Sequence, residues 1–429
     1  MSNFTRIHRR FGLAILLVGG AAVLAQTGSA PLANVPADRI FVHAIAEQSE
    51  KITDIDSLDW SGKNNRLLVD RRALSRFYSL YTMTPEGFRL QSVVLSKPGS
   101  MPTHAGGGSW HPGGEYFIFT AQKQGIPDHA RAVPRIGWHN DLWLGTTDGS
   151  AFWQLTNTPS QRNAPTGAVY PSFSADGTKV FWAGTTGKRT DSPWNQRSLF
   201  IADFTFENNA PKLDNIQEFQ PGENRDFYEP YGFSPDGNRV LFAGNLVGGN
   251  PWFDLDIYAY DRRGPRLVKL TDAPRVWNRF ATYSPDGGKI VWTSSGGMVI
   301  RSLGPNGERW ERYLRSELWI MDENGRRAKQ LTFFNTAGHP HFVGKRVFVG
   351  DSAFSPDGRY LAIVLYQEGS NFDPESRIVM LKLGDGPPAK FEWKTGGEET
   401  PAPAVEPEKP AEPAPVIVDP DRKPAKVTW

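Results

Sequence analysis

The stretch YGFSPDGNRVLFAG, residues 231–244, recurs along the chain. Close copies are PSFSADGTKVFWAG from Pro171, ATYSPDGGKIVWTS from Ala281 and SAFSPDGRYLAIVL from Ser352, and more distant ones are SLDWSGKNNRLLVD from Ser57 and GSWHPGGEYFIFTA from Gly108. In the shared Ser-Pro-Asp-Gly turn, proline presets φ, serine and aspartate bond local backbone groups, and glycine takes a positive φ. Each copy therefore predicts a β-hairpin, whose serine and aspartate we interpret as structural.

Each hairpin leads into a second one. A further alternating strand is followed by a turn and a Leu-Thr ending, as in DLWLGTTDGSAFWQLT from Asp141, DIYAYDRRGPRLVKLT from Asp256 and ELWIMDENGRRAKQLT from Glu317. One unit thus holds four short strands, which cannot bury both faces of their sheet alone, whereas radial repetition buries them. We expect an all-β fold over residues 31–394, a six-bladed β-propeller of four-stranded antiparallel blades.

Ring closure needs a strand from outside the six repeats. The segment DRIFVHAI, Asp38–Ile45, lies just before the first repeat and is predicted to complete the last blade. The segment AKFEWK near Lys390 is the competing candidate for that outermost place.

The repeats resemble those of TolB-type propellers. The shared features are the aromatic-Ser-Pro-Asp-Gly turn, the strands IYAYD and LWIMD, and the Leu-Thr ending. The resemblance covers roughly residues 38–394 and implies an exported, periplasmic protein of the cell envelope. TolB carries a sizeable α/β domain before its propeller, and only residues 31–56 separate the predicted signal peptide from the first repeat here. The resemblance therefore implies a TolB-like propeller without that domain.

Both ends of the chain differ in composition from the repeats. Arg6, Arg9 and Arg10 precede the apolar run Phe11–Ala25, which predicts a signal peptide over residues 1–30. Ordinary secretion, twin-arginine export and an uncleaved membrane anchor are the alternatives. Residues 395–429 are rich in Pro, Ala and Glu and predict a disordered tail. Two functional interpretations remain. The tail could be a tether across the envelope, or it could dock on a partner through the apolar segments VIV from Val416 and the terminal VTW.

Composition excludes several classes of protein. The chain has no cysteine, which rules out disulfides and thiolate sites. Without the three leader arginines, 45 basic residues face 46 acidic ones, so no basic excess points to nucleic acid. No G-x-S-x-G, P-loop or dinucleotide-binding motif is present in the sequence.

Strand parity predicts which end of the propeller binds. Turns between strands one and two and between strands three and four lie on one face and are tight. The remaining connections lie on the opposite face and hold nearly all the length variation, as in the loops from Gln122, Thr185, Thr293 and Phe333. Long loops on a rigid scaffold are where binding usually occurs.

These long loops contain recurring tryptophans and arginines. The predicted binding residues are Trp138, His139, Trp194, Arg197, Trp252, Trp277, Arg279, Trp310 and His104. Further arginines in the same loops are Arg131, Arg135, Arg189, Arg275, Arg309 and Arg312. Aromatic rings stack on sugars or apolar side chains, and guanidinium groups pair with carboxylates. The alternative is that the tryptophans pack between blades and the arginines stay solvated.

Histidines in these loops offer a possible metal site. His339 and His341 could present two imidazoles to one divalent metal, with His104 or His139 as a further candidate ligand. An HPH-like pair resembles that of oligogalacturonate lyases, which are propellers that bind a divalent metal. The extra ligand expected nearby is not evident in this sequence, so we favour no cofactor.

Three functions remain open at this point. The first is a non-enzymatic binding or scaffold protein, periplasmic or secreted, that engages an envelope protein or peptide through the long-loop face. The second is a metal-dependent lyase, hydrolase or lectin acting on acidic oligosaccharides. The third is a detached peptidase-type propeller. We expect no nucleic-acid partner, and a membrane contact only through an uncleaved leader.

Overall fold

The computed structural model describes the repeats almost completely. The described residues are 32–48, 53–72, 77–96, 103–123, 125–126, 129, 131–188, 194–223, 225, 227–248, 253–299, 313–369, 374–394 and 416–417. The predicted signal peptide, residues 1–30, lies outside them, as does the predicted tail apart from residues 416–417. Among the described residues no helix is long and apolar enough to cross a membrane.

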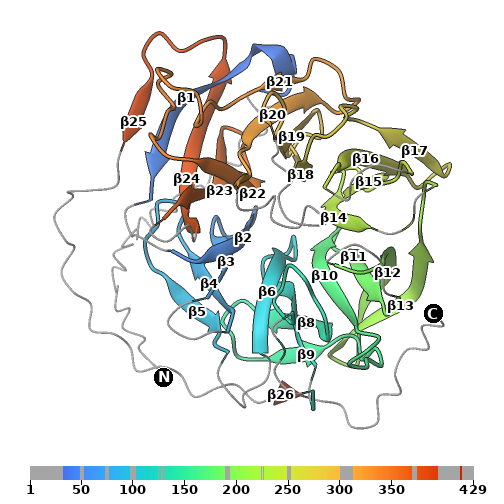
Figure 1. Cartoon of the computed structure of the whole chain (residues 1–429). Helices are drawn as coiled ribbons and strands as arrows, with labels where there is room; N and C mark the ends of the chain where they lie inside the picture. Colours follow the sequence, from blue (N-terminus) through green and yellow to red (C-terminus); the bar gives the residue numbers. More distant parts are fainter. Residues whose placement is uncertain are drawn as a thin grey trace, which may run out of the picture.

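Six sheets surround a central axis, and the chain runs round the ring in order (Figure 1). Blade 1 comprises β2 (Ile55–Trp60), β3 (Leu67–Arg71), β4 (Ser79–Met83) and β5 (Gln91–Val94). Blade 2 comprises β6 (Thr103–Trp110), β7 (Tyr116–Gln122), β8 (Asn140–Thr146), β9 (Phe152–Gln154) and β26 (Val416–Ile417). Blade 3 comprises β10 (Thr166–Phe173), β11 (Lys179–Thr186), β12 (Arg197–Glu207) and β13 (Ala210–Phe219).

The second half of the ring follows the same plan. Blade 4 comprises β14 (Tyr228–Phe233), β15 (Arg239–Gly244), β16 (Asp256–Asp261) and β17 (Arg266–Lys269). Blade 5 comprises β18 (Asn278–Tyr283), β19 (Lys289–Ser294), β20 (Glu317–Asp322) and β21 (Lys329–Gln330). Blade 6 comprises β22 (Val347–Phe354), β23 (Tyr360–Glu368), β24 (Pro374–Asp385), β1 (Ile40–Glu47) and β25 (Glu392–Lys394). The short 3₁₀ helix η1 (Ala37–Arg39) precedes β1. The predicted all-β six-bladed propeller is confirmed.

The Ser-Pro-Asp-Gly turns form the hydrogen bonds that their residues predict. In blade 4, Ser234 Oγ donates to Asp236 Oδ1 at 2.5 Å, and the N–H of Gly237 donates to the carbonyl of Ser234 at 2.8 Å. Gly237 has a φ of 68°, a conformation that glycine adopts without strain. The same arrangement recurs at Ser174, Ser284 and Ser355. We define the end of the propeller that carries these turns as the tight-turn face and the opposite end as the long-loop face.

The Leu-Thr ending also has a structural role. Thr271 Oγ1 donates to Asp256 Oδ1 at 2.8 Å and accepts the N–H of Ile257 at 3.0 Å. These bonds tie the end of a blade's fourth strand to the start of its third strand. Thr156 with Asp141 and Thr332 with Glu317 repeat the link in blades 2 and 5.

Hydrophobic clusters fill the spaces between neighbouring blades. The cluster between blades 2 and 3, for example, joins Ile118 and Leu144 to Val180 and Phe200. Each of the other five blade interfaces has a comparable cluster of buried side chains. The core is therefore a ring of six interfaces rather than one central body.

The N-terminal strand closes the ring. β1 pairs antiparallel with β24, with Ile40 opposite Asp385 and Glu47 opposite Val379. The predicted strand at Asp38–Ile45 is thus confirmed with slightly shifted bounds. The competing segment near Lys390 is present as well, because β25 adds parallel to the outer side of β1 as a fifth strand.

Replacing Ile45 by alanine tests this closure. Ile45 is fully buried in the cluster between blades 5 and 6, so Ile45→Ala should lower the free energy of unfolding by about 3 kcal/mol. Urea denaturation measures the change. Val247→Ala, at an exposed position in a loop, is the matched control and should cost less than about 0.5 kcal/mol. Equal effects of the two substitutions would contradict closure by β1.

Candidate functional site

The connections of the long-loop face bury a hydrophobic cluster of their own. It contains Trp194, Phe227, Phe253, Leu255, Trp277 and Leu314, all from connections of blades 3 to 5. Trp194 and Trp277 are only 7% and 2% exposed. These two tryptophans therefore act first as packing residues that hold the loops of three blades together.

A cavity of about 240 Å³ lies beside this cluster, at the long-loop end of the central channel. We call it the mouth cavity. Its wall is made by Asp56, Arg131, Arg135, Ile136, Tyr170, Trp194, Trp277, Arg279, Phe280, Leu314, Phe348 and Tyr366. Aromatic rings from blades 3, 5 and 6 thus face charged groups from blades 1, 2 and 5.

Irregularities in the innermost strands place two of these rings. The register of β10 shifts between Val169 and Ser172, and that of β18 shifts between Arg279 and Thr282. Tyr170 and Phe280 lie at these bulges with φ of 49° and 53°, a conformation rare for large side chains. Both rings line the mouth cavity and also a second cavity of about 380 Å³ that extends toward the tight-turn face. They therefore stand between the two cavities.

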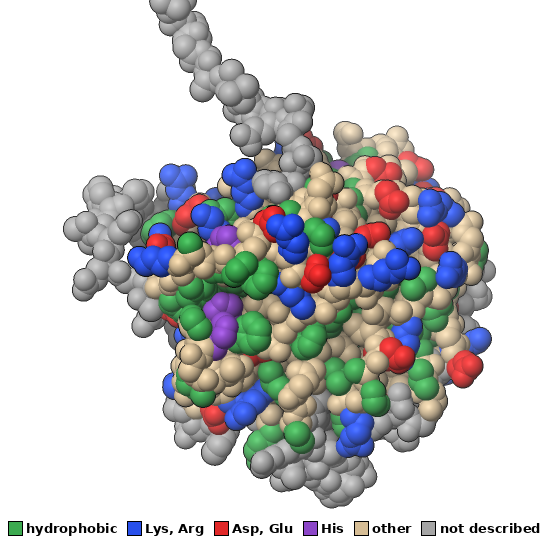
Figure 2. Space-filling view, turned by 90° about the horizontal axis from the view of Figure 1, so that it is seen from above, with side chains coloured by type: hydrophobic (Ala, Val, Ile, Leu, Met, Phe, Trp, Pro, Cys, Tyr) green, Lys and Arg blue, Asp and Glu red, His purple; other side chains and the backbone are tan. Residues whose placement is uncertain are grey.

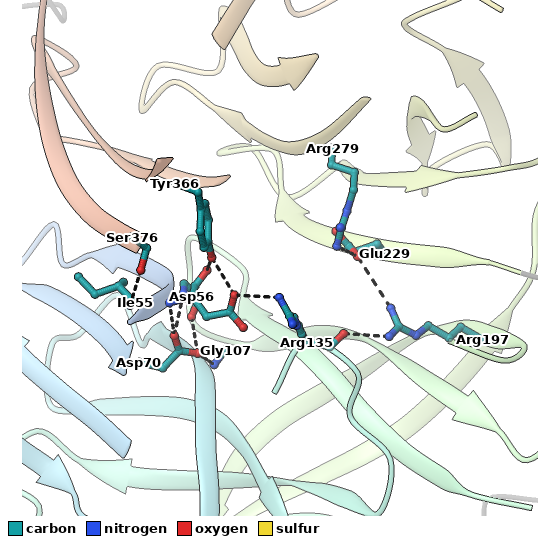
Figure 3. Close-up of polar contacts among 11 residues, drawn as sticks. Ile55, Asp56, Asp70, Gly107, Arg135, Arg197, Glu229, Arg279, Tyr366 and Ser376 are labelled. Atoms are coloured by element: carbon teal, nitrogen blue, oxygen red, sulfur yellow. Dashed lines mark hydrogen bonds and ion pairs between the residues drawn. The ribbon is translucent and has the colours of Figure 1, made fainter. Parts of the chain in front are cut away.

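A buried carboxylate lies between two arginines at one wall. Glu229, in β14, accepts hydrogen bonds from Arg279 through both of its oxygens, and the Arg279 Nε to Glu229 Oε1 distance is 2.8 Å. Arg197 Nη1 lies 3.9 Å from Glu229 Oε2 (Figure 3). The hydroxyl of Tyr231 donates to Oε1 at 3.0 Å. Burial is the largest single influence and would lower the pKa of Arg279, but the charge and hydrogen bonds of Glu229, together with Tyr231 and Tyr170, raise that pKa.

Arg197 connects this carboxylate to a neighbouring loop. It is fully buried and donates from Nη2 to the backbone carbonyls of Arg135 and Ile136, at 3.0 and 3.2 Å (Figure 3). Burial lowers the pKa of Arg197 to about 10, which still leaves it charged at neutral pH. Arg197 thus fixes the loop that brings the half-exposed side chain of Arg135 to the mouth cavity.

The opposite wall is acidic. Asp56, at the start of β2, accepts the hydroxyl hydrogen of Tyr366 at 2.8 Å and lies 3.8 Å from Arg135 Nη1 (Figure 3). Behind it, Asp70 accepts the N–H groups of Ser57 and Gly107 at 2.7 and 2.8 Å. Burial and then the charge of Asp56 raise the pKa of Asp70 to about 7. The mouth cavity therefore has acidic and basic groups on facing walls, with aromatic rings between them.

The structure brings together some of the predicted binding residues. Trp194, Trp277 and Arg279 line the mouth cavity, and Arg197 supports it. Trp138 and His139 lie farther out in the same loop system, where the guanidinium of Arg131 lies 4.5 Å from the Trp138 ring. Trp252 and Trp310 lie outside the described residues, as do Arg189, Arg309 and Arg312.

Three buried histidines that were predicted in the long loops occupy separate environments. His104 lies instead in the strand β6, where its buried ring is 4.9 Å from that of Phe77. His139 forms a 2.7 Å hydrogen bond with Ser160. His341 lies against the rings of Phe391 and His339, and burial followed by the charge of His339 lowers its pKa to about 3.

The two histidines of the predicted metal pair lie close together, but no third ligand is grouped with them among the described residues. The ring centroids of His339 and His341 are 4.4 Å apart, and His339 Nδ1 accepts the N–H of His341. In the part of the chain that the structure describes, no three His, Asp or Glu side chains are grouped so as to hold a metal ion.

Sequence reasoning did not identify several strand residues of the site. Asp56, Tyr170, Phe280 and Tyr366 line the mouth cavity, and Glu229 binds Arg279 of its wall. In the sequence each stands in an ordinary strand, and the bulges that aim Tyr170 and Phe280 have no signal of their own. The DFYEPYGF context of Glu229 offered one clue, a carboxylate in an otherwise apolar strand.

Surface charge is mixed on the side of the ring that lies at the top of Figure 1. Figure 2 shows basic and acidic side chains interspersed there among hydrophobic ones. No field of one sign covers this side, as expected from the near balance of charge in the whole chain.

Comparison with known proteins adds information on the fold alone. TolB from Acinetobacter baumannii is 16% identical with a TM-score of 0.41, over 77% of this chain and 64% of that chain, so this chain spans less than two thirds of its length. The putative TolB from Agrobacterium tumefaciens is 16% identical with a TM-score of 0.46, over 78% of this chain and 90% of that one. Oligogalacturonate lyase from Vibrio parahaemolyticus is 10% identical with a TM-score of 0.41, over 80% and 91%.

No protein-family model matches the chain, and no curated protein matches its sequence. The prediction of a TolB-like propeller is confirmed at the level of the fold, which the six sheets themselves establish. At these identities and TM-scores the solved structures say nothing about the chemistry of the mouth cavity.

Removing the buried carboxylate should destabilise the propeller. Glu229→Gln keeps the shape of the side chain but leaves Arg197 and Arg279 without a buried counter-charge, at an expected cost of about 3 kcal/mol in urea denaturation. Arg39→Gln, which breaks the exposed pair with Asp385, is the control and should cost less than about 1 kcal/mol. Similar losses in both variants would show that Glu229 does not neutralise the two arginines.

The buried His341 should make stability depend on pH. Its folded pKa of about 3 lies below the ordinary value of 6.5, so its contribution is complete above pH 6.5 and is lost as pH falls toward 3. His341→Phe should reduce the loss of unfolding free energy on acidification by about 1 kcal/mol for each pH unit below 6.5. Denaturation curves of both proteins at pH 7.5, 5.5 and 4.5 measure this, and parallel losses would contradict it.

Proposed function

We propose that this protein is an exported binding protein that engages a protein or peptide segment through the mouth cavity of its long-loop face. The observation that carries the proposal is the composition of that cavity: Asp56 on one wall, Arg135 and Arg279 on others, and aromatic rings between them. A peptide combines apolar side chains with charges of both signs, and this combination matches the wall.

The size of the mouth cavity favours binding of a single side chain of a partner. About 240 Å³ is below the roughly 300–1,000 Å³ usual for pockets that hold a whole drug-sized ligand. A cavity of this size suits one anchoring side chain of a larger partner. Aromatic anchors in such pockets, surrounded by polar contacts, supply most of the binding energy at many protein interfaces.

The side chains around the mouth cavity are held in place before a partner binds, and this favours binding. Arg197 fixes the loop at Arg135 and Ile136, and the buried carboxylate of Glu229 holds Arg279 against the ring of Phe280 at 4.6 Å. Side chains held in place before binding lose little conformational entropy on association. The predicted leader of residues 1–30 supports a location of this activity in the periplasm or outside the cell.

Selection from a displayed library of random peptides tests the proposal. Peptides enriched on the full-length protein should bind Arg135→Ala about ten-fold more weakly or worse, because its side chain is half exposed at the cavity wall. Arg326→Ala, exposed in a turn of the tight-turn face, is the control and should leave the affinity unchanged.

Two outcomes would overturn the proposal. One is that no peptide is enriched, and the other is that enriched peptides bind both variants equally. An array of acidic oligosaccharides probed with the same three proteins addresses the alternative of a lectin or lyase, for which arginines at the wall of the cavity would pair with uronate carboxylates.

A further inference from the structure

The outer edge of blade 2 carries a strand from the far end of the chain. β26 pairs parallel with β9, with Val416 opposite Phe152 and Ile417 opposite Trp153 (Figure 1). On its other side β9 pairs antiparallel with β8, with Leu144 opposite Trp153. β9 would otherwise be an edge strand, and the unpaired N–H and C=O groups of such an edge readily accept another strand.

An aromatic surface adjoins this edge. The ring of Tyr116 lies 6.3 Å from that of Trp153 and 5.0 Å from that of Phe206. Phe206, near the C-terminal end of β12, is 41% exposed. Blades 2 and 3 thus present a partly exposed aromatic patch, here defined as Tyr116, Trp153 and Phe206, next to the edge that β26 occupies.

The sequence around β26 favours a short strand that can pair with the edge of blade 2. Residues 412–420 read EPAPVIVDP, so the apolar triplet Val416–Val418 stands between Pro415 and Pro420. Proline has no N–H to donate, and it therefore limits a strand to the residues between two prolines. The triplet is the most apolar segment of a region dominated by Pro, Ala and Glu, and an apolar segment is what the aromatic patch would favour.

Chain length allows the segment to reach its place from blade 6. The chain leaves blade 6 at Lys394, the end of β25, and residues 395–415 connect it to β26 in the sequence. A segment of that length extends to roughly 70 Å at most, which exceeds the width of one blade several-fold. Covalent attachment through such a segment gives an effective concentration on the order of 1 mM.

We infer that the outer edge of blade 2 is a strand-acceptor site whose occupant is the chain's own segment Val416–Val418. The backbone of β9 supplies the hydrogen-bonding groups, and the aromatic patch favours apolar side chains. The occupant is held by few backbone pairs, so it exchanges, and the vacated edge accepts the same segment from solution. The C-terminal region is therefore a latch closed by β-strand addition in the same molecule, at a site separate from the mouth cavity.

A proline substitution in the full-length protein tests the latch. Ile417→Pro removes an N–H within β26 and should open the edge without disturbing the blades, so that the midpoint of thermal unfolding stays unchanged. Hydrogen–deuterium exchange of the amides in Phe152–Gln154 should be at least ten-fold faster than in the wild type. Val427→Pro, in the same C-terminal region but outside β26, is the matched control and should leave this exchange unchanged.

A synthetic peptide supplies the second measurement. Residues 411–422, labelled with a fluorophore, should bind the Ile417→Pro protein and bind the wild type at least ten-fold more weakly, because the tethered segment competes at a far higher effective concentration. The same peptide carrying Ile417→Pro should not bind either protein.

Three results would overturn the inference. They are equal exchange of Phe152–Gln154 in wild type and Ile417→Pro, failure of the peptide to bind the opened protein, and dimerisation of the wild type that Ile417→Pro abolishes. The last result would assign the occupant to a second copy of the chain. None of these measurements depends on peptide binding at the mouth cavity, so the two proposals can fail independently.

Discussion

The pairing of β1 with β24 joins residues from the two ends of the ring, and every blade interface depends on it. An open ring would leave two blades with one apolar face each in water. The cluster that β1 completes includes Ile40 and Ile45 together with side chains of β20 and β23, so the strand closes its own sheet and also seals the interface with blade 5. Because the other five clusters lie between blades that closure holds in place, burial around the whole ring is cooperative. β25 then covers the outer side of the closing strand.

A closed ring of twisted sheets leaves a channel at its axis, and this protein fills one end of that channel with large side chains. The filling requires departures from regular structure, since an unbroken strand directs successive side chains to its two faces and few of them to the axis. Bulges in β10 and β18 turn Tyr170 and Phe280 toward the channel, at the cost of left-handed backbone conformations. Removing the carboxylate of Glu229 from water also costs free energy. This cost is offset by the hydrogen bonds of Arg279 to both carboxylate oxygens and by the nearby charge of Arg197. Features that oppose stability but are held firmly in place are common where a protein binds its ligand.

The six repeats are alike, but their inner ends are not, and this difference creates the site. Blade 1 contributes Asp56, blade 5 contributes Arg279, and the loop of blade 2 contributes Arg135. The hydrogen bonds of the turns and of the Leu-Thr endings recur from blade to blade because they stabilise each unit by itself. The residues at the channel do not recur, because each contacts a different neighbour across the axis. The repeated units thus form the scaffold, and the residues that differ between blades at the long-loop face form the cavity.

Sequence by itself determined the blade number, the hairpin turns, the closing strand and the face that carries the long connections, because these depend on local turn chemistry and on the alternation of apolar residues. It also singled out Trp194 and Trp277 in the long loops, and it placed Arg279 in a loop although Arg279 lies in β18. Only the tertiary structure placed Asp56, Tyr170 and Tyr366 around one cavity and Glu229 against Arg279 of its wall, because these residues come from different blades and meet across the channel. It also decided that β1 and β25 both belong to blade 6 and that Val416–Ile417 joins blade 2. Pairings between residues hundreds of positions apart depend on the geometry of the closed ring, and no local pattern encodes them.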